Sequence, residues 1–303
     1  MSTSRVAAGS RTAERAARPA SAARKSRLRT IIDASWVDAV AFVVVAIVFL
    51  VPFTFIVLTA AKTQAEASLA QFSWPSPFQL VQNLVDVLAF GNGLMLLALW
   101  NSTLLTIGSV TLIVLFSALI AFVMQRRADR YSTVARSVIM TGLIIPPAVV
   151  PTIFVLQTLG LYKTLPGLIL VEVGFHLPFA TLVLLAFIAS IPREIDESAV
   201  IDGASPLRLF FSIILPLLWP AIVTVIVVQS VAIYNDFASP LYFLPGSQNV
   251  TAQLTLFNFI SQFNTSFNLL FADVVLITIP PLLMFLFFQR QIVSGMTAGA
   301  VKG

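Results

Sequence analysis

Cysteine is absent from this 303-residue chain, histidine occurs once, and only 10% of the residues are charged. Without cysteine there is no disulfide framework and no thiolate ligand, and the single His176 cannot form a multi-histidine metal site within one chain. The scarcity of charge accompanies 58% hydrophobic residues and a mean hydropathy of +0.95. A water-facing surface cannot be built from this composition, so the chain is predicted to be a membrane protein with no metal site.

Nucleotide-binding and hydrolase motifs are missing as well. None of the lysines has the glycine spacing of a G-x-x-x-x-G-K-S/T phosphate loop, and neither G-x-S-x-G nor G-x-G-x-x-G occurs. We therefore expect no enzyme and no cofactor in this chain, and any energy source for its work must lie in another molecule.

Six uncharged apolar stretches predict an all-α polytopic membrane protein, because about 20 apolar residues span a hydrocarbon core. They lie within residues 39–61, 100–123, 137–159, 165–189, 213–239 and 269–289. Residues 236–273 also lack internal charge, but Pro245, Gly246 and many amide and hydroxyl side chains favour an external loop.

The distribution of lysine and arginine predicts the orientation in the membrane. If the N-terminus is cytoplasmic, 16 of the 18 basic residues lie on the inner side, and only Lys62 and Lys163 lie outside. Both termini are then cytoplasmic. The predicted division is a basic, disordered tail at 1–35 near anionic lipid, a membrane domain at 36–290 and a C-terminal tail at 291–303.

Proline is concentrated in the predicted spans, which hold nine of the 17 prolines in addition to Pro166 at the start of the fourth span. Each removes a helix hydrogen bond, so bends or breaks are expected near these residues. Nine together favour helices that move or line a cavity. They are Pro52, Pro146, Pro147, Pro151, Pro178, Pro216, Pro220, Pro280 and Pro281.

The connection between the fourth and fifth spans carries the most informative pattern. Pro192 suits the first position of a helix, the acids after it oppose the positive end of the helix dipole, and Gly203 can end the helix in a left-handed conformation. Ser205-Pro206 predicts a new helix start, and Pro216 a bend. One arginine stands against four acids, Arg193 against Glu194, Asp196, Glu197 and Asp202. A helix on anionic lipid would be basic, so this one is expected to dock a protein; a solvated connecting helix is the alternative.

Residues 197–216 resemble a specific family signature. Glu197-Ser198-Ala199, then Gly203 after three residues, then Ile213 and Leu215-Pro216, resembles the E-A-A---G---------I-L-P signature of ABC importer permeases. From about Trp36 onward the chain resembles the second, six-span permease of maltose-type carbohydrate importers. The further matching segments are 101–102, 146–151, 159–164, 177–179, 190–192, 202–204, 235–237 and 295–303. Ser198 and Tyr234 depart from the pattern, which usually has Ala and Trp.

The resemblance implies partners and residue roles. The partners are a second permease subunit, two cytoplasmic ATPase subunits that bind ATP and Mg, and an extracytoplasmic sugar-binding protein, with no nucleic acid. The implied ATPase-coupling residues are Glu197, Ser198, Ala199, Asp202, Gly203, Ala204, Ile213, Leu215 and Pro216. The implied second contact, in the C-terminal tail, comprises Gly295, Gly299, Lys302 and Gly303.

Polar residues in the spans are candidates for a substrate passage. Glu172 and His176 are four residues apart, so they share a helix face. An ionisable residue inside a membrane is a functional candidate, although a mutually satisfied pair is the alternative. With Gln229, Tyr234 and Asn235 they form the predicted passage set.

The function predicted from the sequence is that of a permease subunit of an ATP-driven sugar importer in the cell membrane, working by alternating access. An importer of glycerol phosphate or a peptide is one alternative. An ion-coupled secondary transporter is another, but it usually places charge near the membrane midplane, and this chain has little there.

Overall fold

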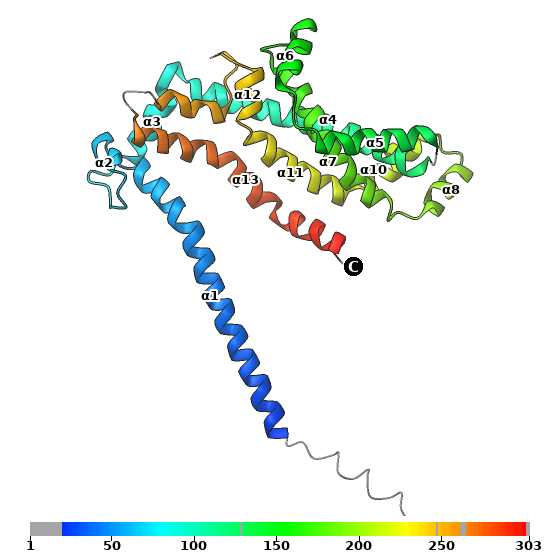
Figure 1. Cartoon of the computed structure of the whole chain (residues 1–303), viewed down its shortest axis with the longest axis horizontal. Coiled ribbons are helices and arrows are strands. Elements are labelled where there is room, and N and C mark those ends of the chain that lie inside the picture. Colours follow the sequence, from blue (N-terminus) through cyan, green and yellow to red (C-terminus); the bar gives the residue numbers. More distant parts are fainter. Residues whose placement is uncertain (1–19, 128, 247, 261–264, 301–303) are drawn as a thin grey trace, which may run out of the picture. The chain divides into compact units, whose positions relative to one another are not determined.

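The computed structural model describes residues 20–127, 129–246, 248–260 and 265–300, of which 20–35, 37 and 290–300 are described by their backbone alone. Every regular element among these residues is helical (Figure 1). Residues 1–55 and 56–303 form two compact units, each described by itself. The longer helices are α1 Ala20–Ala60, α3 Leu80–Ala89, α4 Leu94–Arg126, α5 Arg130–Ile144, α6 Val149–Thr158, α7 Leu165–Ile188, α8 Arg193–Ile201, α11 Trp219–Tyr234 and α13 Phe267–Ala300. The short ones are α2 Gln64–Ser68, η1 Phe90–Asn92, α9 Pro206–Leu209, η2 Phe210–Ile214, α10 Leu215–Leu217, α12 Ala238–Phe243 and η3 Ala252–Phe259.

The predicted all-α membrane architecture is confirmed. Four helical stretches in the described chain are long and apolar enough to cross a membrane, and two bent helix pairs raise the number to six if each pair is one span. The continuous ones are Asp38–Ala60, Leu94–Arg126, Leu165–Ile188 and Phe267–Gln289. The third and fifth predicted spans are the bent pairs.

Helix α1 contains the first span and shows no break at the predicted end of the tail. It runs continuously from Ala20 to Ala60, with Pro52 inside it. The Thr54 hydroxyl donates to the carbonyl of Leu50 one turn earlier, which satisfies its polar atom inside the helix. The predicted domain division at residues 35 and 290 stays a prediction.

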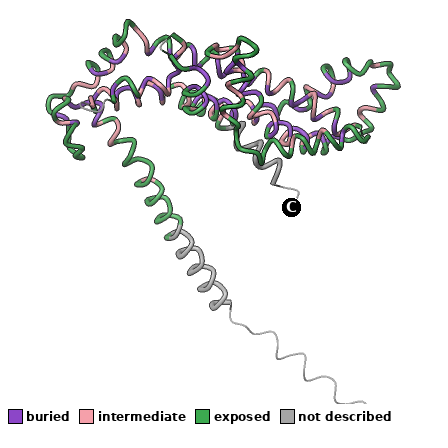
Figure 2. The backbone as a smooth tube through the Cα atoms, turned by 45° about the horizontal axis from the view of Figure 1, so that its top comes forward, coloured by how far each residue is buried: buried purple, intermediate pink, exposed green. Residues whose placement is uncertain are grey.

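Helices α4 and α7 form the centre of the second unit. They make the most extensive contact between any two described elements, and their buried faces meet in one hydrophobic core with η2 and α11. Buried residues recur along the helices of this unit, with exposed residues between them (Figure 2). Leu105 and Ile113 of α4 and Leu168 and Leu184 of α7 are at most 1% exposed.

The prolines act differently from one span to the next. Pro146 and Pro147 separate α5 from α6, which meet at a bend of 117°. The fifth span bends by 73° between Leu217 and Trp219, after a π-helical turn at Phe210–Ile214. In contrast, α7 and α13 continue through their internal prolines. The expected breaks therefore occur in two spans, where a cap or a helix start accompanies the proline.

The stretch 236–273, predicted to be an external loop, is partly helical and closely packed. Its η3 helix is tied to the start of α4, because the Asn101 side-chain amide donates to the Val250 carbonyl and the Ala252 N–H donates to the Ser102 hydroxyl. Thr255 donates from its hydroxyl to the carboxylate of Asp273 at 2.9 Å, and Asp273 lies fully buried in α13. This segment thus closes one end of the bundle.

The start of α7 provides a test of this packing. A Cβ atom added to Gly167 would lie 2.1 Å from the carbonyl oxygen of Leu161, whereas one added to Gly174 in the same helix would meet nothing within 4 Å. We expect Gly167→Ala to destabilise the protein by about 1–3 kcal/mol or more through overpacking. Gly174→Ala is the control and should be neutral or stabilising by up to about 1 kcal/mol. Thermal unfolding of the purified protein in detergent measures both, and equal midpoints for the two variants would contradict this packing.

Candidate functional site

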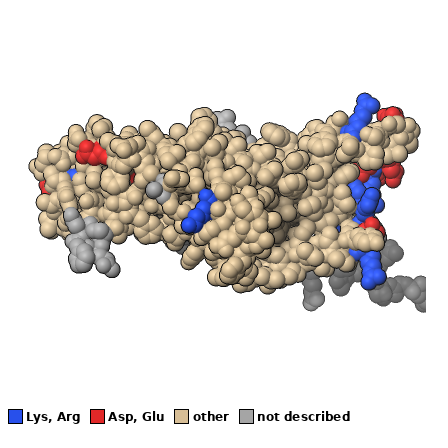
Figure 3. All heavy atoms as spheres, turned by 90° about the horizontal axis from the view of Figure 1, so that it is seen from above, with Lys and Arg blue, Asp and Glu red and all other residues tan. Residues whose placement is uncertain are grey.

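Charged residues are concentrated at one end of the second unit. Figure 3 shows lysine, arginine and carboxylate side chains concentrated at the end where α8 lies, with few on the remaining visible surface. Those around α8 and the α4–α5 connection are Arg126, Arg127, Asp129, Arg130, Arg193, Glu194, Asp196, Glu197 and Asp202. This is the end that the sequence predicts to be cytoplasmic.

Helix α8 forms where local sequence rules place it, with one correction. Pro192 is the cap residue before the helix and not its first helical residue as predicted. Its backbone is extended, with ψ at 142°, and it makes no side-chain cap hydrogen bond. Glu194 and Asp196 lie in the first turn, as expected for acids at the positive end of a helix. The Ser205 hydroxyl accepts from the Arg208 N–H, which confirms the predicted fresh start at α9.

The end of α8 explains two small residues of the signature. The Ala204 N–H donates to the Ala199 carbonyl at 2.9 Å, and the Gly203 N–H donates to the Val200 carbonyl at 3.0 Å. These two bonds, with Gly203 at a φ of +79°, form a Schellman motif. Ala199 is 6% exposed and packs against the bundle, so a larger side chain would not fit there without rearrangement. Ala199 and Gly203 are therefore required by the shape of the turn.

Helix α8 has one face on the bundle and one face free. Ile195 and Ala199 pack with Ile191 into the core. The opposite side exposes Glu197, together with two apolar side chains, Val200 at 60% and Ile201 at 85%. The exposed residues that complete this free face are Glu194, Ser198 and Asp202. Apolar side chains exposed beside acids at a charged end are typical of a protein-docking surface rather than of a solvated connection.

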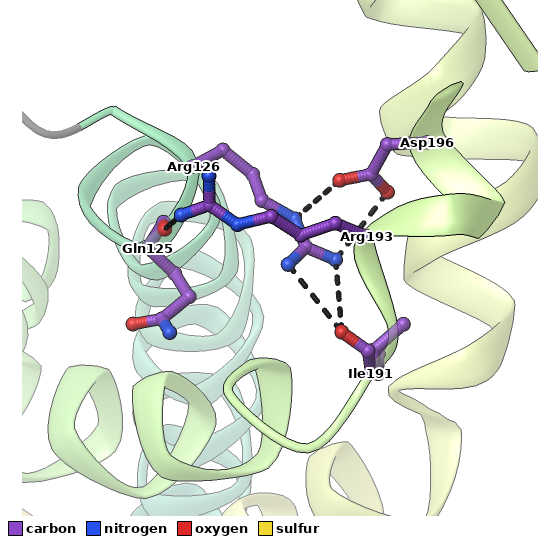
Figure 4. A network of polar contacts seen from close by, with 5 residues as sticks. All are labelled: Gln125, Arg126, Ile191, Arg193 and Asp196. Atoms are coloured by element: carbon purple, nitrogen blue, oxygen red, sulfur yellow. Dashed lines mark hydrogen bonds and ion pairs between the residues drawn. The ribbon is translucent and has the colours of Figure 1, made fainter.

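An arginine cluster fixes α8 to the end of α4 (Figure 4). Arg126, the last residue of α4, forms an ion pair with Asp196, and both side chains are largely buried, at 13% and 15% exposure. Its guanidinium also donates to the Ile191 carbonyl at 3.4 Å. From the other side, Arg193 donates to the Gln125 carbonyl at 3.3 Å. Asp196, expected on the docking surface, is therefore paired within the chain.

The second half of the signature lies away from the free face of α8. Ile213 and Leu215 pack against the hydrophobic core, and Leu215 and Pro216 line a cavity between α4, α10, α11 and α13. These three predicted coupling residues therefore stand at the bend of the fifth span and not on α8. Their coupling role stays a prediction.

The cavity has a volume of about 980 Å³. None of its lining residues is charged. Hydroxyl and aromatic groups interrupt an apolar wall, and the residues that supply them are Thr103, Thr106, Thr111, Trp219, Ser230 and Tyr234. Pro280 and Pro281 of α13 complete it opposite α4.

The predicted passage residues lie in three separate places. Tyr234 lines the cavity. Glu172 and His176 form the expected i,i+4 pair, with 3.3 Å between Oε2 and Nε2, and Gln229 donates to the His176 carbonyl at 3.4 Å. These three residues join α7 to α11 and are not among the residues that line the cavity. Asn235 lies beyond the end of α11 and accepts from Gln253 of η3.

The predicted contact in the C-terminal tail is only partly described. Gly295 and Gly299 belong to α13, whose backbone is helical as far as Ala300. Lys302 and Gly303 lie outside the described residues. Sequence patterns did not single out Arg126, although its position at the charged end of a span was an available signal, nor did they single out Trp219 and the threonines of α4.

Comparison with known proteins agrees with this geometry. Residues 113–298 match the family described as "Binding-protein-dependent transport system inner membrane component". A Caldicellulosiruptor protein named as an ABC transporter permease is 33% identical over 84% of this chain and 92% of its own length. The diacetylchitobiose uptake system permease of Streptomyces coelicolor is 29% identical over 85% of each chain.

A solved structure shares the fold. A chain from a bacterial ABC transporter involved in the import of alginate superposes with a TM-score of 0.74, covering 88% of this chain and 97% of its own, at 19% identity. The family match covers more than half of the chain and includes the end of α4, α8, α11 and the bends. The chain therefore belongs to the binding-protein-dependent transport system inner membrane components, the multi-pass membrane permease subunits of ABC importers.

Proposed function

We propose that this chain is one of two permease subunits of an ATP-driven carbohydrate importer. Two ATPase subunits on the cytoplasmic side bind ATP and Mg, an extracytoplasmic binding protein delivers the sugar, and both termini are cytoplasmic. The observation that carries this proposal is the free face of α8, a rigidly capped helix that presents Glu197, Val200 and Ile201 at the charged end.

The character of the cavity supports a neutral, hydroxylated substrate. Sugars bind through stacking on aromatic faces and through hydrogen bonds to hydroxyls and amides, and the wall offers Trp219, Tyr234 and several hydroxyls. A phosphate ester or a peptide terminus would bury a charge, which is costly without a partner. The uncharged wall therefore favours sugar over glycerol phosphate or a peptide, in agreement with the name of the diacetylchitobiose system.

The mechanism follows from two sites, the free face of α8 and the cavity. The ATPase subunits hold the free face of α8 and displace it as they close on ATP. The displacement changes the packing of the helices around the cavity between outward-open and inward-open states. To change the ratio of the two states from 1:99 to 99:1, the ATPase subunits must bind the favoured state about 5.5 kcal/mol more tightly than the other. We expect a rigid element to transmit this difference better than a mobile loop. The Schellman end and the ion pair make α8 such an element.

Charge reversal on the docking face tests the ATPase contact. In the co-purified complex, Glu197→Lys should reduce sugar-stimulated ATP hydrolysis and uptake together, because it places a cation where the partner meets a carboxylate. Arg136→Glu, an exposed charge reversal on α5, is the control.

A panel of sugars, glycerol phosphate and peptides, tested for stimulation of ATP hydrolysis by the wild-type complex, identifies the solute. Wild-type uptake in Glu197→Lys, or stimulation by none of the sugars, would contradict the proposal.

A matched pair of tryptophans tests the cavity. Trp219 and Trp100 are similarly exposed, at 60% and 62%, but only Trp219 lines the cavity. Trp219→Ala should raise the KM for sugar uptake by roughly two- to tenfold, the factor that about 0.5–1.5 kcal/mol of lost aromatic contact represents. Trp100→Ala should leave it unchanged. If both variants change KM equally, the cavity is not the passage.

A further inference from the structure

Helix α4 has two properties that no other long helix among the described residues combines. It contains no proline over its 33 residues, whereas α1, α7, α11 and α13 all contain proline. It also supplies seven of the 17 residues that line the cavity, from Thr103 to Leu115. At 1.5 Å per residue it forms one continuous helix of roughly 50 Å. A displacement at its charged end therefore reaches the cavity wall.

The contact between α8 and α4 is confined to a few groups. Arg126 and Asp196 are the only described side chains of opposite charge that form an ion pair between these two helices. The pair is supported by hydrogen bonds of Arg126 to the Ile191 carbonyl and of Arg193 to the Gln125 carbonyl. Because both partners are mostly buried, water and salt screen the attraction weakly, and removal of one partner leaves the other charge uncompensated.

The rest of α8 reaches the bundle through small apolar contacts. Ile195 is half-buried, and Ala199 offers only a methyl group to the core. Such contacts can slide, because they have no directional preference. The ion pair is directional and holds two defined groups together. It is therefore the contact that is best suited to carry a displacement of α8 into α4.

We propose that Arg126 and Asp196 are positioning residues that clamp α8 to α4, so that the two helices move as one body and ATPase-driven motion of α8 reaches the cavity wall through α4. This inference rests on the proposed docking of the ATPase subunits on α8. It assigns Asp196 to the interior of the permease, while Glu197 next to it faces the partner.

The first experiment separates ATP hydrolysis from transport. The complete importer is reconstituted in proteoliposomes with Arg126→Gln, with Asp196→Asn, or with the exchange of Arg126→Asp and Asp196→Arg, and sugar uptake per ATP hydrolysed is measured. Each single variant should lower this ratio by about fivefold or more, the lower end of typical coupling between sites. Sugar-stimulated hydrolysis should persist, and the exchange should recover much of the ratio. Arg136→Gln, an unpaired exposed arginine on α5, is the matched control.

The second experiment uses the absence of cysteine from this chain. Arg126→Cys and Asp196→Cys are combined, with the other subunits free of reactive cysteine, and joined by a short thiol cross-linker. Before cross-linking, the variant should have the low uptake per ATP of the single variants. Cross-linking should restore the uptake per ATP. The covalent bridge takes the place of the ion pair, and α8 and α4 are proposed to stay together throughout the transport cycle.

The outcomes are distinct. Unchanged uptake per ATP in both single variants, or loss of uptake on cross-linking, would overturn the clamp. A parallel fall in hydrolysis and uptake, with the ATPase subunits still bound, would mean that the pair only maintains the structure and would also overturn it. If the wild-type complex itself shows no ATP-dependent uptake, the proposed function fails instead, irrespective of the clamp.

Discussion

The end of α4 is the point on which the arrangement of the charged end depends. The last carbonyls of a helix have no partner within the helix and must find donors elsewhere. Here Ser132 donates to the Met124 carbonyl and Arg193 to the Gln125 carbonyl, so α5 and α8 each satisfy one of them. Arg126 adds the ion pair to Asp196. One helix end thus fixes the direction in which the chain enters α5 and the position of α8.

This constraint gives the family signature a physical meaning. Ala199 is small because it faces the bundle, and Gly203 is required because the chain reverses there with a positive φ. Glu197, by contrast, is exposed, and neither packing nor backbone conformation requires a glutamate there. The signature therefore combines residues that shape the helix with an exposed residue, which the proposed function assigns to the ATPase contact. The substitution of Ser198 is tolerated because its hydroxyl donates to the Glu194 carbonyl of the same helix.

Local patterns predicted the elements whose formation depends on neighbouring residues. The boundaries of α8, the left-handed Gly203, the cap at Ser205 and the pairing of Glu172 with His176 all follow from spacing along one segment. The single local error, the placement of Pro192 inside the helix, is a shift of one position.

Contacts distant in sequence could not be predicted in this way. Arg126 and Asp196 are 70 residues apart, and Ser102 and Ala252 are 150 apart. The same limit applies to the prolines, because a proline breaks a span only where neighbouring elements can satisfy the freed backbone groups. The cavity likewise required the relative placement of the four helices that line it, which no single stretch of sequence specifies.

The division of α8 into a free face and a bundle face is the central claim, and cross-linking to the ATPase subunit tests it most directly. Because the chain has no cysteine, single cysteines can be placed at Val200, which is 60% exposed, and at the adjacent Ala199, which is 6% exposed. In the assembled importer, Val200→Cys should cross-link to the ATPase subunit and Ala199→Cys should not. Cross-linking at both positions, or at neither, would contradict the account.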